Sequence, residues 1–152
     1  MQKFTYHSLA ELLTAAQRCG VTLPHSTDLS ILGTEKQIGI SHVKLKNRLT
    51  IHPMEGFDGN EDGSPGEWTM RRCERFAEGG AGLIWLEATA VVEEGRTSSS
   101  QLWLHDGTLD AFKALAERMH KLSNGTPLIL QLTHSGRFSR PHNLPAPVIS
   151  YH

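Results

Sequence analysis

Three short apolar segments recur along the chain, and each ends in a distinctive polar or small residue. They occupy residues 49–54, 82–88 and 128–134. The middle segment belongs to an expected strand over 81–88 that is almost continuously apolar, as strands buried on both faces of a parallel sheet are. The third predicts a strand over 127–133. These lengths suit strands rather than helices.

Two amphipathic helices are predicted between these strands. The first has strong start signals, with Ser64 as N-cap, Pro65 in the first helical position and Glu67 completing a capping box. It should end at Gly79-Gly80, and the second helix should cover 108–122 and close at Asn124-Gly125. Strands that alternate with helices indicate an α/β fold with a parallel sheet.

The amino-terminal part of the sequence lacks the alternation of strands and helices that is predicted for the rest. Ser8 and Glu11 have capping-box spacing before a helix that should stop at Gly20. A loop over 21–34 and a short hairpin over 37–47 follow. We therefore expect an amino-terminal helix and loop extension over 1–31 and an α/β unit over 32–152.

Chemistry in parallel α/β folds collects beyond the carboxyl ends of the strands. Met54, Ala88 and Gln131 stand at those expected ends. A glycine-rich loop after Met54 should lie over the same face. A long loop is expected over 89–107, and no regular element is expected in 135–152. Loops of more than about a dozen residues in compact domains are usually functional or disordered.

Composition narrows the function classes. A formal net charge of −1 gives no electrostatic case for binding nucleic acid or a membrane surface. The apolar runs are too short for a spanning helix, and no signal peptide follows Met1. Cys19 and Cys73 are too few for a disulfide framework, so a reduced, cytoplasmic setting is expected.

Several residues that could suggest metal binding, thiol reactivity or catalysis also have structural interpretations. No metal site is expected, because the histidines are dispersed and the acidic loop of Asp58, Glu61 and Asp62 lacks the EF-hand ligand order. Cys73 falls on the apolar face of its helix and should be buried and inert. Glu87 is either catalytic or, more plausibly, a cap for loop amides.

Three motifs together resemble the Old Yellow Enzyme family of flavin oxidoreductases. They are Asn47-Arg48-Leu49-Thr50-Ile51-His52-Pro53-Met54, the stretch from Gly82 to Arg96, and Leu130-Gln131-Leu132-Thr133-His134-Ser135-Gly136-Arg137. Their order and spacing also agree with the family, and the likeness covers roughly 32–140. Each motif alone is modest, but three in order are specific.

The resemblance implies a barrel of eight strand–helix units that binds FMN over its carboxyl face. Pro53 and Met54 would then offer backbone contacts to the flavin ring, and the small Ala88 would let the ring approach closely. Gln131 would hydrogen-bond the pyrimidine edge with both its donor and its acceptor. The implied reaction passes a hydride from NADH or NADPH through FMN to an electron-poor small molecule, as in ene-reductases.

Other positions are less conventional. Glu55 stands where the family often has Thr or Cys, and a carboxylate there would repel a reduced flavin unless it turned away or stayed protonated. His134 and Arg137 are candidates for the substrate side, although His134 could equally satisfy hydrogen bonds within its loop. No residue is assigned to catalytic proton transfer.

The predicted fold is incomplete: it comprises the first three strand–helix units of a TIM (β/α)8 barrel. The family's substrate-anchoring pair, a basic residue at the flavin and the phosphate grip come from later strands. Open barrel edges favour self-association of the chain. The alternative function is a truncated, non-catalytic scaffold or assembly fragment of the same fold.

Overall fold

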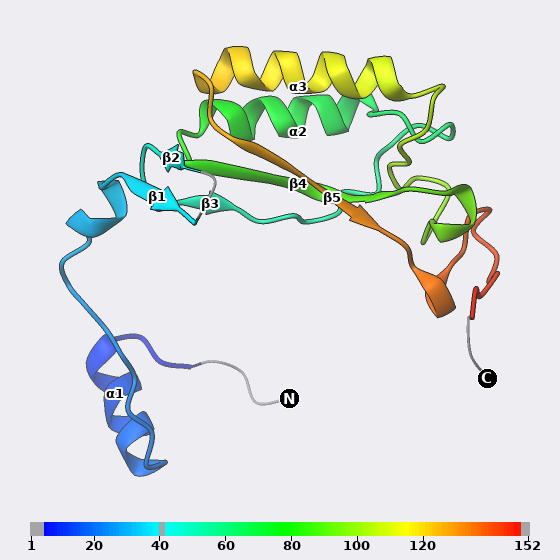
Figure 1. Ribbon diagram of the computed structural model, residues 1–152. Helices are drawn as coiled ribbons and strands as arrows, with labels where there is room; N and C mark the ends of the chain where they lie inside the picture. The colour runs from blue at the N-terminus through cyan, green and yellow to red at the C-terminus, as the bar shows by residue number, and fades with distance from the viewer. Residues whose placement is uncertain (1–4, 40–41, 150–152) are drawn as a thin grey trace. The chain divides into compact units, whose positions relative to one another are not determined.

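The computed structural model describes residues 5–39 and 42–149 (Figure 1). The chain divides into two compact units, one ending at Ser30 and the other beginning at Ile31. No helix in these described ranges is long and apolar enough to cross a membrane.

The first unit contains helix α1, Leu9–Arg18. The Ser8 hydroxyl accepts a hydrogen bond from the Glu11 amide at 3.2 Å, as the capping signal predicted. The Glu11 carboxylate, however, accepts from the amide of His7 at 3.0 Å, one residue before the position that a capping box uses. Gly20 follows the C-cap with a φ of 68°, which confirms it as the stop.

A short 3₁₀ helix, η1, Ser30–Gly33, begins at the last residue of the first unit and continues into the second. The sequence had indicated only a loop there. The expected hairpin is present: β1, Lys36–Ile38, pairs antiparallel with β2, Val43–Leu45. Residues 40 and 41, at the predicted turn, lie outside the described residues.

Three parallel strands form the main sheet in the order β3-β4-β5. They are β3, Thr50–Ile51; β4, Leu83–Ala90; and β5, Leu128–Thr133. The first strand stops earlier than predicted, because Pro53 has no N–H with which to extend a ladder. The second continues to Ala90, whose amide donates to Leu102 O at 2.8 Å and whose carbonyl accepts from Leu104 N at 2.9 Å.

Two helices cover one face of this sheet and lie side by side (Figure 1). They are α2, Glu67–Glu78, and α3, Leu109–Ser123. The N-cap of α2 is Gly66, so the predictions for Ser64 and Pro65 were wrong. The Ser64 hydroxyl donates instead to Asp62 Oδ1 at 2.7 Å, and a Cβ at position 66 would lie 2.3 Å from Asp58 O. Asn124 ends α3 in the left-handed conformation, as predicted.

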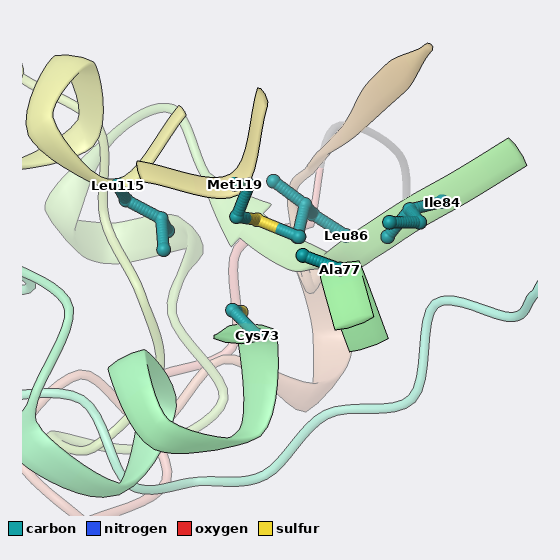
Figure 2. Close-up of a cluster of buried hydrophobic side chains, with 6 residues drawn as sticks. All are labelled: Cys73, Ala77, Ile84, Leu86, Leu115 and Met119. Atoms are coloured by element: carbon teal, nitrogen blue, oxygen red, sulfur yellow. The ribbon is translucent and has the colours of Figure 1, made fainter. Parts of the chain in front are cut away.

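The hydrophobic core lies between the helices and the sheet (Figure 2). Its buried residues are Cys73, Ala77, Ile84, Leu86, Leu115 and Met119. Cys73 is buried, as predicted, and burial raises the pKa of its thiol to about 12, which makes the reactive thiolate scarce near neutral pH.

On the face of the sheet opposite α2 and α3, no α-helix of the described second unit covers the strands (Figure 1). Trp85 and Ile129 face each other across β4 and β5, and they are 38% and 37% exposed although both are large and apolar. After β5 the described chain holds the 3₁₀ helix η3, Gly136–Phe138, and no α-helix. The parallel sheet of the described part therefore has three strands with two α-helices between them. The expectation of no regular element after 135 was therefore wrong for η3.

Gly66→Ala is expected to lower the free energy of unfolding by about 1–3 kcal/mol, the usual cost of overpacking. The added methyl group would overlap the Asp58 carbonyl. A Cβ at Gly33 meets nothing within 4 Å, so Gly33→Ala is the matched control and should be nearly neutral. Urea midpoints at unchanged m-value measure both; equal midpoints for the two variants would refute the close approach.

Met119→Ala should lower the free energy of unfolding by about 2–5 kcal/mol, because it empties a fully buried site between α3 and β4. Leu109→Ala, at an exposed position of the same helix, should cost far less. Thermal unfolding of the two variants checks this difference. Similar losses in both would place Met119 outside the core.

Candidate functional site

The carboxyl edge of the sheet contains a local irregularity between β4 and β5. Leu86 is opposite Leu130 and Thr89 is opposite Leu132, so Glu87 and Ala88 together face the single residue Gln131. Such a β-bulge re-aims side chains and is common at barrel rims and beside active sites. Ala88 and Gln131, predicted separately, therefore lie across from each other on neighbouring strands.

The segment after β3 is fastened to this same edge. The Gly56 amide donates to Glu87 Oε2 at 2.8 Å. Gln101 Nε2 donates to Glu55 Oε1 at 2.9 Å and to Ala88 O at 3.3 Å, which bridges the segment and the strand. Pro53 is half-buried, and Met54 is 75% exposed. Met54, Ala88 and Gln131 thus occur at one edge of one sheet.

Glu87 has a structural role in this arrangement. Its carboxylate accepts from the Gly56 amide and from the Arg72 guanidinium, which also binds Asp58. The Thr69 hydroxyl donates to Asp58 Oδ1 at 2.6 Å. Burial opposes ionisation of Asp58, but the hydrogen bonds from Arg72 and Thr69 outweigh it and lower its pKa. The interpretation of Glu87 as a cap for loop amides is confirmed.

The long loop after β4 is held by a buried cation. Arg96 is 2% exposed, and its guanidinium donates to the backbone carbonyls of Glu61, Ser99 and Gln101. Burial lowers the pKa of Arg96. Sequence reasoning quoted Arg96 only as part of a motif and missed Gln101, because an isolated polar residue in a loop gives no pattern.

Glu55 turns toward Gln101 and is half-buried. Burial raises its pKa, the hydrogen bond from Gln101 opposes that rise, and the nearby charge of Glu87 adds to it. The carboxyl group therefore takes up a proton more readily than an exposed glutamate does.

The two substrate-side candidates follow β5 and are both exposed. His134 Nδ1 accepts a hydrogen bond from the Gly136 amide at 2.9 Å, so this ring satisfies its own loop, as one of the two interpretations had it. Within the described residues, the side chains of Arg137 and Gln131 make no hydrogen bond or ion pair. Their donors and, in Gln131, an acceptor are thus available to a ligand.

Comparison with known proteins identifies relatives. Residues 36–149 match the model of the NADH:flavin oxidoreductase / NADH oxidase family. The chain is 39% identical over 100 residues to an NADPH dehydrogenase of Listeria welshimeri, an alignment that covers 64% of this chain and 29% of that protein. The chain therefore spans under a third of this curated relative's length.

Solved structures agree in fold. Morphinone reductase aligns at 28% identity with a TM-score of 0.60, covering 72% of this chain and 28% of that one. A 2-naphthoyl-CoA reductase aligns at 20% identity with a TM-score of 0.66, over 74% of this chain and 17% of that one. Because the family model covers most of the chain and these structures share its fold, the chain belongs to the NADH:flavin oxidoreductase / NADH oxidase family.

Proposed function

We propose that this chain supplies one wall of the FMN site of a flavin-dependent oxidoreductase. The protein would pass a hydride from NADH or NADPH to an electron-poor small molecule. One observation carries the proposal: the bulge that sets Ala88 opposite Gln131, with the 53–56 segment fastened to the same edge. Residues 32–152 would form the first three strand–helix units of the barrel, and 1–31 an extension.

The residues at this edge suit a flavin. Pro53 and Met54 offer an apolar surface and backbone groups, and the methyl side chain of Ala88 leaves room for a planar ring. The Gln131 amide has no partner among the described residues, so both of its hydrogen-bonding groups can meet the donor and acceptor edge of the ring. These features support FMN as the cofactor.

When bound, FMN supplies two-electron chemistry by taking up and giving up a hydride. Gln131 would hold the pyrimidine edge in place and donate a hydrogen bond where negative charge collects on reduction, which favours the reduced form. Pro53, Met54 and Ala88 would orient the ring and exclude water from one side. The substrate-side candidates His134 and Arg137 follow directly after β5.

Glu55 would oppose this tuning. An ionised carboxylate near the ring disfavours added negative charge, but the hydrogen bond from Gln101 directs Glu55 toward the β4 end, and its raised pKa eases protonation. We infer that Glu55 chiefly anchors the 53–56 segment.

The alternative proposal is a non-catalytic scaffold that keeps the fold without binding flavin. The exposure of the large apolar side chains Trp85 and Ile129 favours it for the isolated chain, because apolar surface promotes self-association. Flavin binding separates the two proposals.

Titration of FMN with the purified chain is expected to quench flavin fluorescence saturably. Gln131→Ala should weaken this binding about tenfold, the worth of one or two lost hydrogen bonds. Gln17→Ala, an exposed glutamine of α1, is the matched control and should bind like the unsubstituted chain. Absence of quenching would favour the scaffold, and equal affinity in Gln131→Ala would remove Gln131 from the site.

Glu55→Gln should raise thermal stability at pH 8 and leave it little changed at pH 4. The reason is the raised pKa: the folded state binds the proton more tightly, so the carboxylate costs stability above its folded pKa, and that cost disappears as the pH falls through it. Melting temperatures of both proteins across this range provide the test. A difference independent of pH would contradict the assignment.

A further inference from the structure

A concave surface lies beside the carboxyl edge of the sheet, in the part of the chain that follows β5. It has a volume of about 340 Å³ and is lined by Thr97, Arg137, Phe138, Ser139, Arg140 and Pro145. Hydrogen bonds hold this segment against the long loop. The backbone N of Arg140 donates to Arg96 O at 2.7 Å, and the side-chain Nδ2 of Asn143 donates to Ser99 Oγ at 2.7 Å. The hollow is therefore framed by two segments that bind each other.

The charge of this hollow is positive. Arg137 and Arg140 are exposed, and no carboxylate of the described residues lies within 4 Å of either guanidinium. The nearby Glu93 lies 3.9 Å from His142 Nε2. The hollow along α2 is also lined by arginines, but there Arg72 is paired with Asp58 and Glu87, and Arg71 lies over the Trp68 ring. Paired guanidinium groups bind planar or tetrahedral oxyanions through several hydrogen bonds at once.

A buried polar group gives an independent sign of a ligand. Ser139 is 1% exposed, and its hydroxyl has no hydrogen-bond partner in the described residues. A buried hydroxyl without a partner costs free energy, so such groups in folded proteins usually meet a water molecule or a ligand. Ser139 lines the hollow and lies between Arg137 and Arg140 in the sequence. After a small shift of the wall, its hydroxyl could donate a hydrogen bond to a bound oxyanion.

The hollow also has an apolar side. Phe138 is 72% exposed and Pro145 lies on the same lining. An anion that carries an apolar or aromatic body would cover these carbons while its oxygens meet the arginines. A fully hydrated inorganic ion would leave them uncovered.

We infer that Arg137, Arg140 and Ser139 form an oxyanion-binding subsite for an anionic group, carboxylate or phosphate, of an organic ligand. Ser135 N donates to Gly95 O at 2.9 Å, which keeps this subsite next to the carboxyl ends of β4 and β5. The further statement that the ligand is the electron acceptor rests on the proposed function. Electron-poor acceptors with a carboxylate or phosphate are then the substrate class.

Calorimetric titration of the flavin-free chain with benzoate and with inorganic phosphate at low ionic strength tests the subsite, because salt screens exposed charges. At least one anion should bind saturably. Arg137→Ala and Arg140→Ala should each weaken binding about five- to tenfold, which corresponds to the net contribution of about one hydrogen bond at an exposed site. Lys121→Ala removes the same charge from exposed α3 and should change affinity less than twofold.

Tighter binding of benzoate would identify a carboxylate, and tighter binding of phosphate a phosphate group. Ser139→Ala should weaken the same anion without lowering the melting temperature of the free protein, because it removes a hydroxyl that has no partner there. Saturable binding of neither anion, or undiminished binding in the doubly substituted arginine variant, would overturn the subsite. Anion binding without FMN quenching would refute the proposed function and leave the subsite intact.

Discussion

The buried carboxylate of Glu87 is the constraint on which the candidate site depends. Removing a carboxylate from water is costly unless charged and hydrogen-bonding partners replace the solvent. Here Arg72 from α2 and the Gly56 amide supply them, so one side chain joins the strand, the helix and the loop between β3 and α2. The position of Met54 and Glu55 therefore follows from a charge requirement, while packing alone would have left this exposed segment loosely placed.

A second hydrogen-bond network, centred on Gln101, completes the edge. Gln101 is buried. Its side-chain Nε2 donates to the Glu55 carboxyl group and to the Ala88 carbonyl, and its Oε1 accepts from the Thr97 backbone amide. Its own carbonyl accepts from Arg96. The long loop over 89–107 is thus ordered by polar bonds to its backbone together with the buried side chain of Leu102.

Much of this could be predicted from the sequence. Apolar runs and cap residues placed β4, β5, α2 and α3 to within a few residues, and the strand-end rule brought Met54, Ala88 and Gln131 to one edge. The errors were local: Ser64 looked like an N-cap, but the true cap is Gly66, chosen by the closeness of the Asp58 carbonyl. Long-range partners such as Arg72 with Glu87, or Gln101 with Glu55, leave no periodic signal, so only the fold reveals them.

The bulge between β4 and β5 also constrains the number of residues at the end of β4. Beyond Leu86 the register of the two strands is shifted by one residue. This extra residue determines to which face of the sheet each following side chain of β4 points. A single-residue deletion between Leu86 and Thr89 would turn the end of the strand inside out, and Ala90 would lose its register with Leu102 and Leu104 of the loop. The residue count at this end of β4 is therefore set both by its neighbour β5 and by the loop that it supports.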